Sequence, residues 1–182
     1  EQTCKGTAFQ ATLRKNGIEG VVTQKARSNQ NPCETVIREL RKRWYRTIFK
    51  TNCPRALWNY GLPHFAKLMQ LTASIAAGLE GRTPLGDLTG ETPDISQYLD
   101  FGWYDWVWFK ENAGLDVPHL GRFLGISHSS SNLMTFFILP ESGIPVQAGT
   151  VQRMTEPEKQ TDANKERMRA FSDKIATKFK EG

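Results

Sequence analysis

The first 86 residues of this 182-residue chain contain no aspartate, and the first one in the sequence is Asp87. This half carries 14 lysines and arginines against 5 glutamates. The balance reverses in residues 87–154, with 3 basic and 8 acidic residues, and residues 155–182 are nearly balanced at 7 and 6. An excess of positive charge confined to one segment is the electrostatic footprint of a surface that faces polyphosphate. A nucleic-acid-binding surface, if the protein has one, is therefore expected in the first half.

Cysteine is scarce, and long hydrophobic runs are missing. The three cysteines, Cys4, Cys33 and Cys53, are odd in number and widely spaced, which is typical of reduced thiols in an intracellular protein. Together with the three histidines they form no zinc-binding spacing. The apolar stretch 62–79 is interrupted by polar residues, so no membrane association is expected. Because the sequence has neither an initiating methionine nor a signal peptide, we expect residue 1 to be a cut edge.

Residues 1–80 are predicted to form helix, strand, helix and helix. The patterns place a short helix over 9–15 that stops at Asn16-Gly17, a strand over 18–23, and longer helices over 35–50 and 55–77. Pro63 should kink or restart the last helix. The apolar stripe of that helix is assigned to the core: Leu57, Trp58, Leu62, Phe65, Leu68, Met69 and Leu71. Glycine and proline then mark residues 81–98 as a turn-rich connector.

From residue 99 the pattern changes to short strands, predicted over 101–109, 121–126, 132–139 and 146–154. Such spacing favours a small antiparallel β-barrel over 99–154. In the first of these strands, Trp103 and Val107 are expected on one face, opposite Tyr104, Trp106 and Trp108. One set would fill the barrel interior, and the other would be covered by the first half, the tail or a partner. Residues 155–182 are charged and predict a weakly helical, flexible tail.

The segment Gln30-Asn31-Pro32-Cys33-Glu34 stands directly before a basic helix. Asn31 can cap that helix, and Pro32 suits its first position. One and two turns beyond Glu34 the same face carries Arg38, Arg41 and Lys42, and the bases at 43 and 46 lie nearby. A carboxylate beside so many cations suits a metal-dependent enzyme acting on a polyphosphate backbone, because the carboxylate holds a divalent cation while the bases bind phosphates.

Two simpler explanations compete with this one. Glu34 also fits a capping box, in which its side chain reaches back to the N–H of Asn31, and taken alone this is the commoner use of such a residue. Charged helix faces are also usually just solvated. However, five bases against the single acid Glu39 are too lopsided for ordinary pairing along a helix.

Four blocks, in this order, resemble the integrase of copia-type retrotransposons and together cover nearly the whole chain. Gln30-Asn31-Pro32-Cys33-Glu34 resembles the QN-x-x-E block that carries the last acid of the family's Asp-Asp-Glu triad. Gly81-Arg82-Thr83-Pro84, continued by Thr89-Gly90-Glu91-Thr92-Pro93, resembles its connector. Gly121-Arg122-Phe123-Leu124-Gly125 resembles its G-x-F-L-G strand, and Thr150-Val151-Gln152-Arg153 the strand that closes its C-terminal barrel.

The resemblance implies an α+β or α/β fold: the C-terminal part of an RNase H-like integrase core (1–80), a connector (81–98), a Src-homology-3-like barrel (99–154) and a charged tail (155–182). It implies Mg²⁺- or Mn²⁺-dependent strand transfer of element DNA into target DNA in the nucleus, after a stage in a cytoplasmic particle, and a homo-oligomer is an open expectation. Glu34 takes the role of catalytic acid and metal ligand. Arg38 and Arg41 fall where integrases place DNA-contacting bases, and Lys42 and Arg46 extend the same basic helix.

The chain departs from the family in two respects. The other two acids of the triad are aspartates that precede the glutamate, and none stands before Asp87, so we expect no activity from this chain alone. The family's zinc-binding N-terminal module is missing as well. The predicted barrel is acidic, which suits protein contact better than DNA. Three hypotheses stay open: an integrase fragment, a non-catalytic DNA-binding remnant, and an interaction module built on the aromatic barrel.

Overall fold

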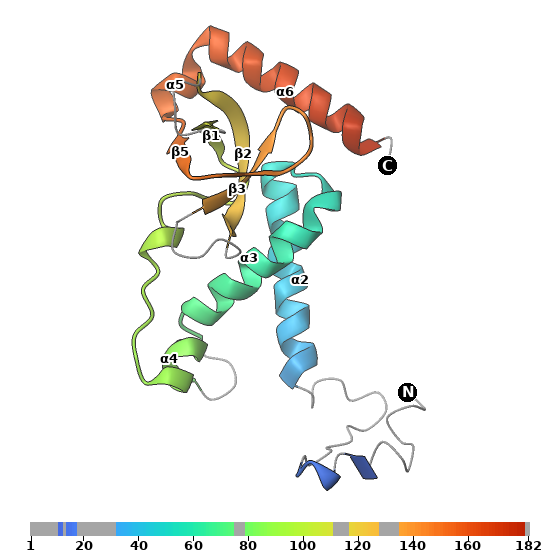
Figure 1. Cartoon of the computed structure of the whole chain (residues 1–182), viewed down its shortest axis with the longest axis vertical. Helices are drawn as coiled ribbons and strands as arrows, with labels where there is room; N and C mark the ends of the chain where they lie inside the picture. Colours follow the sequence, from blue (N-terminus) through green and yellow to red (C-terminus); the bar gives the residue numbers. More distant parts are fainter. Residues whose placement is uncertain are drawn as a thin grey trace. The chain divides into compact units, whose positions relative to one another are not determined.

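A computed structural model describes residues 11–12, 14–17, 32–74, 79–110, 117–127 and 135–180 of the chain. The chain divides into two units, Glu1–Arg38 and Glu39–Gly182, and one long helix runs across the boundary. The described part of the second unit combines helices with an antiparallel sheet, which confirms the α+β class (Figure 1). None of the helices in the described ranges is both long and apolar enough to cross a membrane.

In the first unit, the predicted helix stop at Asn16-Gly17 is confirmed. Residues 14–15 are helical, and Asn16 and Gly17 form a turn. Gly17 has a φ of +66°, the left-handed conformation that ends helices, and the Asn16 side chain donates to the carbonyl of Thr12 at 2.8 Å. The strand predicted over 18–23 and the start of the helix at residue 9 lie outside the described residues.

The basic helix is α2 (Pro32–Thr51), which contains the predicted range 35–50 and extends to the proline expected at its first position. It begins at the proline, whose fixed φ suits a first helical position, and ends before Asn52, which has a φ of +54°. Trp44 and Ile48, one turn apart, are buried in the core of the second unit. The apolar pattern therefore marks the buried side of α2 in its C-terminal half.

The next helix is α3 (Trp58–Leu71), entered through the 3₁₀ turn η3 (Arg55–Leu57). Pro63 lies inside α3. The predicted extension to residue 77 is wrong, because α3 stops at Leu71 and Thr72 is extended, with its N–H and hydroxyl both donating to the carbonyl of Leu68. Trp58, assigned to the apolar stripe, is 58% exposed.

The connector contains more regular structure than its glycines and prolines predict. A short helix, α4 (Pro84–Thr89), is capped by the Thr83 hydroxyl, which accepts from the Gly86 N–H at 3.0 Å. It ends at Gly90, whose φ of +78° is the usual helix terminator. A 3₁₀ turn, η5 (Ser96–Tyr98), follows before the sheet.

The sheet has five antiparallel strands in the order β4-β3-β2-β1-β5. Four strands follow one another as a meander, and the fifth returns to pair with the first, so that β4 and β5 form the two edges. The strands are β1 (Trp106–Lys110), β2 (His119–Ser127), β3 (Thr135–Pro140), β4 (Val146–Ala148) and β5 (Thr150–Arg153). The single strand predicted over 146–154 is thus two strands, separated by Gly149.

Both faces of the sheet are buried. Along β3, Phe136 and Ile138 belong to one apolar cluster while Phe137 and Leu139 pack in the other. The inner cluster, Phe101, Val107, Phe109, Phe123, Phe136, Ile138 and Ala148, comes from the sheet and the residues just before it. The outer cluster joins the sheet to α2, η3 and α6 through Trp44, Ile48, Cys53, Leu57, Trp103, Tyr104, Leu124, Leu139, Phe171 and Ile175. Residues from both sides of the predicted connector therefore share one core.

The two glycines of the Gly121–Gly125 block are required by packing on opposite faces of β2. A Cβ at Gly121 would lie 2.5 Å from Ile138 and 3.0 Å from Phe109 in the inner cluster. Gly125 has a φ of +114°, directly after a shift in the pairing of β2 with β3, and a Cβ there would lie 3.0 Å from Nδ1 of His64 on α3. A side chain at either position would displace the strand or the helix.

The predicted aromatic strand over 101–109 is wrong in its first half. Strand β1 starts only at Trp106, and Tyr104 has a φ of +64°, which breaks the alternation. Trp103 therefore does not share the face of Val107; it packs in the outer cluster, edge-on against Trp44 with ring centroids 5.7 Å apart. The alternation does hold within β1, where Val107 points to the inner cluster and Trp106 packs against the outer one.

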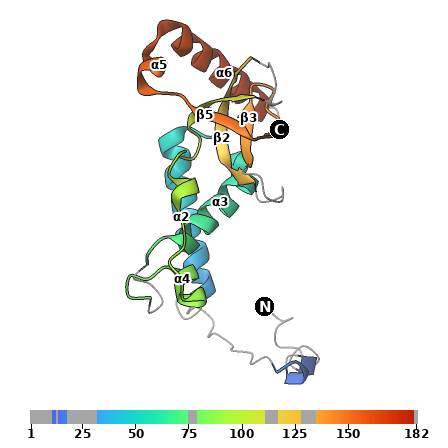
Figure 2. The same cartoon turned by 60° about the vertical axis from the view of Figure 1, so that its left-hand side comes forward.

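Residues 155–180 are an ordered part of the fold, so the prediction of a frayed tail is wrong. Thr155 and Glu158 form a capping box at the start of α5 (Glu156–Gln160), and α6 (Asp162–Lys180) follows. Phe171 and Ile175 of α6 are each 2% exposed, and the Phe171 ring meets Trp106 of β1 edge-on at 5.2 Å. Both views show α6 beside the sheet (Figures 1 and 2). Of the three covers that the sequence left open for the outward-facing aromatics, the tail supplies the one over Trp106.

A substitution at Trp103 tests the outer cluster. Trp103→Ala should lower the free energy of unfolding by about 3–5 kcal/mol, because a buried indole leaves a cavity that its surroundings fill only in part. Trp58→Ala is the matched control, since its indole is exposed, and should cost less than about 1 kcal/mol. Urea unfolding followed by circular dichroism measures both. Equal losses would contradict the burial of Trp103.

Candidate nucleic-acid interface

Every residue that the sequence assigns to the site lies on α2 and is exposed. Glu34 is in the first turn, Arg38 follows one turn later, and the remaining bases extend toward the C-terminal end. The exposed residues are Glu34, Arg38, Arg41, Lys42 and Arg46. Because α2 is a single unbroken helix, its residues follow the spacing of 3.6 per turn from which the sequence placed the bases one and two turns beyond Glu34.

Glu34 occupies the position that an acid favours in a helix, with its carboxylate at the positive end of the helix dipole. Its exposure leaves it accessible to a cation or to solvent. The competing explanation, a capping box with Asn31, involves a residue that lies outside the described ranges. Glu34 as a metal ligand and Glu34 as a capping residue therefore both remain hypotheses.

The described residues do not form a metal site by themselves. No group of three or more His, Cys, Asp or Glu side chains gathers within the ranges that the structure describes. Divalent cations such as Mg²⁺ need several oxygen ligands, and Glu34 supplies only one carboxylate. Any metal site that includes Glu34 would need carboxylates from elsewhere.

The bases of α2 are only weakly compensated. Glu39 approaches Lys42 at 3.9 Å and Arg43 at 3.7 Å, and all three side chains are more than 40% exposed, so these ion pairs add little stability. Among the described residues, Arg41 and Arg46 have no ion pair. A helix that keeps such charges in water without pairing them holds a positive potential that attracts phosphate.

The sheet, in contrast, has few cations to offer. Of the two arginines in residues 87–154, Arg122 lies between the rings of Tyr104 and Trp106, with its Cζ 4.5 and 3.3 Å from their centroids. Burial lowers the pKa of Arg122 to about 10, and its Nη1 donates to the Tyr104 carbonyl at 2.8 Å. Arg153 pairs with Asp105 at 3.1 Å. Arg122 therefore packs inside the fold, and the charge of Arg153 is paired with a carboxylate.

Two aromatic side chains on α2 were not recognised as candidates from the sequence. Tyr45 is 51% exposed and Phe49 is 79% exposed, and they are one turn apart among the bases. The sequence did contain a signal for them. Tyr45 and Phe49 each directly follow a core-facing residue, Trp44 or Ile48, so the helical period places them off the buried face.

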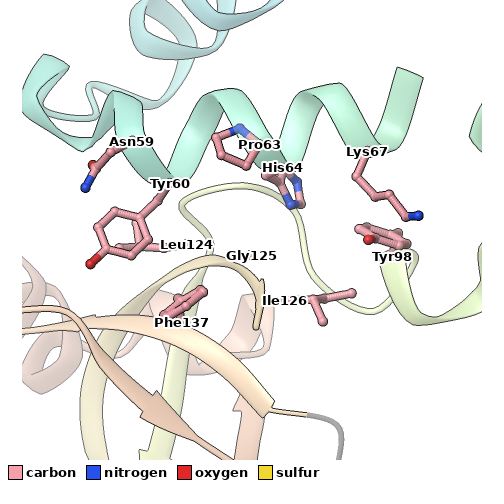
Figure 3. Close-up of a pocket in the computed structure, with 10 residues that line it drawn as sticks. All are labelled: Asn59, Tyr60, Pro63, His64, Lys67, Tyr98, Leu124, Gly125, Ile126 and Phe137. Carbon is pink, nitrogen blue, oxygen red and sulfur yellow. The ribbon is translucent and has the colours of Figure 1, made fainter. Parts of the chain in front are cut away.

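A pocket of about 200 Å³ lies between α3 and the β2–β3 part of the sheet (Figure 3). Tyr60 and Phe137 lie at one end, with ring centroids 5.2 Å apart, and Lys67 and Tyr98 lie at the other. His64 points from α3 toward Gly125. The pocket contains none of the residues that the sequence assigned to the site.

His64 is 8% exposed, and its Nδ1 has no hydrogen-bond partner among the described residues. Its ring is surrounded by the rings of Phe65, Tyr98, Trp103 and Phe123, at centroid distances of 5.3 to 6.2 Å. Burial in these surroundings lowers the pKa of His64 to about 4, because the charged imidazolium would lose its hydration. His64 is therefore a neutral core residue at neutral pH.

The two cysteines that the structure describes differ in exposure. Cys33 is exposed, Cys53 is buried, and neither forms a disulfide; Cys4 lies outside the described residues. Burial raises the pKa of the Cys53 thiol to about 12, so it is not a nucleophile at neutral pH.

Comparison with known proteins identified no similar protein. No family model matches the chain, and neither a curated protein nor a solved structure matches it.

The pKa of His64 predicts a pH dependence of stability. The folded value of about 4 lies below the ordinary value of 6.5, so the stability is fully present above pH 6.5 and is lost as the pH falls from there through 4. The loss attributable to His64 should approach about 3 kcal/mol. Urea melts at pH 7.0 and 4.5 should show it in the wild type and not in His64→Gln. The same pH dependence in both proteins would contradict this prediction.

Proposed function

We propose that this chain is the C-terminal part of an integrase of the copia retrotransposon type, and that α2 is its DNA-binding element. Residues 1–80 correspond in this proposal to the end of an RNase H-like core, and residues 99–154 to a Src-homology-3-like barrel. The single observation that carries it is the helix α2, which exposes an acid in its first turn and a row of weakly compensated bases beyond it.

The arrangement of the strands supports the barrel part of the proposal. A meander of four strands whose fifth strand pairs with the first, over an inner apolar cluster, is the strand order that the proposed barrel requires, although β4 and β5 are the edges of an open sheet here. The proposed closing strand, Thr150–Arg153, is the strand that pairs back onto β1. The two motif glycines of β2 also have a clear role in this packing, because a Cβ at Gly121 would overlap Ile138, and the positive φ of Gly125 beside His64 disfavours a side chain there.

In the proposed enzyme Glu34 contributes one metal-binding carboxylate. The remaining carboxylates would come from aspartates outside this sequence, since residues 1–86 contain none and the described residues hold no metal cluster. This chain's own contribution to the reaction is to bind and orient DNA: the exposed bases of α2 neutralise phosphates beside the acid. The proposed cofactor is Mg²⁺ or Mn²⁺, and the proposed setting is the nucleus, after a cytoplasmic particle.

A non-catalytic DNA-binding protein is the second candidate function. The observation that favours it is the exposed basic face of α2, which needs no metal to bind phosphate. An interaction module built on the aromatic strand is less well supported, because Trp106 is covered by Phe171 of the same chain.

Salt dependence tests the basic face. Replacing Arg41, Lys42 and Arg46 with alanine should weaken binding to duplex DNA and reduce the slope of log K against log salt by about 0.9 for each phosphate that is no longer neutralised. Replacing Lys165, Arg167 and Arg169 of α6 removes the same charge from another exposed helix and is the matched control. Fluorescence anisotropy across a salt series measures the slopes. Equal changes of slope in the two triple variants, or no change in the first, would show that the basic side chains of α2 face water and do not bind DNA phosphates.

A substitution at Glu34 tests the catalytic part of the proposal. The chain should be joined to a catalytic segment that supplies two aspartates, and strand transfer should be measured with Mg²⁺. Glu34→Gln keeps the shape of the side chain but removes its charge, so it should abolish transfer and leave duplex binding nearly unchanged. Glu39→Gln, on the same helix, should retain activity. Transfer that survives in Glu34→Gln would refute the metal-ligand role.

A further inference from the structure

The exposed face of α2 is aromatic as well as basic. Tyr45 and Phe49 are 51% and 79% exposed, and among the described residues neither has a ring partner. Counted at 3.6 residues per turn, both lie within roughly 80° of Arg41 and roughly 60° of Lys42 around the helix axis. Large exposed rings normally mark an interaction surface, because leaving them in water costs free energy that a partner recovers. The charge of the neighbouring side chains then decides what kind of partner fits.

The bases next to these rings favour a polyphosphate with accessible bases. Duplex DNA offers phosphates to Arg41 and Lys42, but its stacked base pairs cannot lie on a protein ring. A single strand offers both, because each unpaired base has a free face that stacks on an aromatic side chain. Single-stranded nucleic acid therefore uses both properties of this face, whereas duplex DNA uses only its charge.

The spacing of the two rings agrees with such a ligand. Residues four apart on a helix are separated by about 6 Å along its axis. Stacked bases in one strand are about 3.4 Å apart, so two neighbouring stacked bases are too close to occupy both rings. The rings match alternate bases of a stacked strand, or neighbouring bases of an extended one.

We infer that α2 binds an unpaired stretch of DNA, with bases stacked on Tyr45 and Phe49 and phosphates bound by Arg41 and Lys42. This inference rests on the proposed DNA binding of α2 and specifies the form of DNA that it selects. Stacking contributes in the single-stranded complex and not in the duplex complex. The two rings therefore set a preference, while the basic side chains set the overall affinity.

The experiment compares two probes with the full chain: a 20-nucleotide oligo-dT and a 20-base-pair duplex, by fluorescence anisotropy. Tyr45→Ala and Phe49→Ala should each weaken oligo-dT binding by at least about fivefold. Duplex binding should change by less than about twofold. Because both side chains are exposed, the variants should fold, and thermal melts check this.

Two further variants separate stacking from a general change in the surface. Tyr45→Phe combined with Phe49→Tyr keeps both rings and should retain oligo-dT binding. Val36→Ala combined with Ile37→Ala removes exposed aliphatic side chains, 53% and 48% exposed, from the same helix and should change neither affinity.

The possible outcomes distinguish this inference from the proposed function. Salt-dependent duplex binding with no effect of the ring variants on oligo-dT would overturn the inference alone. Equal losses on both probes would also overturn it, as would ring variants that disturb self-association instead of DNA binding. If the wild-type chain binds neither probe, both the inference and the proposed function are wrong.

Discussion

The burial of apolar side chains on both faces of β2 and β3 is the constraint on which the rest of the second unit depends. Phe123, Phe136 and Ile138 point to the inner cluster, while Leu124 and Leu139 point to the outer one. Both faces of this sheet carry large apolar side chains, so the inner face is buried by residues of the sheet and of the segment just before it, and the outer face is covered by helices. Those helices come from both sides of the sheet in sequence: α2 and η3 before it, and α6 after it.

This packing determines which side of α2 remains available. Trp44 meets Trp103 from the loop before β1 and Phe65 of α3, and a Cβ on Gly61 would overlap the Trp44 ring, so the glycine lets α3 approach the indole. With Trp44 and Ile48 held in the core, Arg41, Lys42, Tyr45 and Phe49 are left exposed. The burial of Trp44 and Ile48 thus fixes the rotation of the helix and determines which of its side chains stay available for the proposed DNA binding. The acidic sheet, whose arginines are buried or paired, adds no competing cationic surface.

Much of this arrangement could be predicted from local patterns, and the failures have physical causes. The ends of α2 follow from Pro32 and from the turn at Asn52, and two strands, β2 and β3, are close to their predicted positions, because local residue preferences dominate there. The prediction of a strand over 101–109 failed because Tyr104 has a left-handed conformation, and its N–H donates to the carbonyl of Phe123 on β2. The local sequence pattern does not show this long-range contact. The prediction of a flexible tail failed because α6, although highly charged, buries two apolar side chains, Phe171 and Ile175, against the sheet. Exposure of Tyr45 and Phe49 likewise depends on which side of α2 the sheet covers.

The central claim is that DNA binds to the exposed face of α2 and not to the sheet. The most direct test is to titrate ¹⁵N-labelled full-length chain with DNA and record which amide signals shift. The account predicts that the largest changes fall in residues 38–50, with residues 106–110 and 135–153 nearly unaffected. Shifts concentrated in the sheet or in α6, with α2 unchanged, would contradict it.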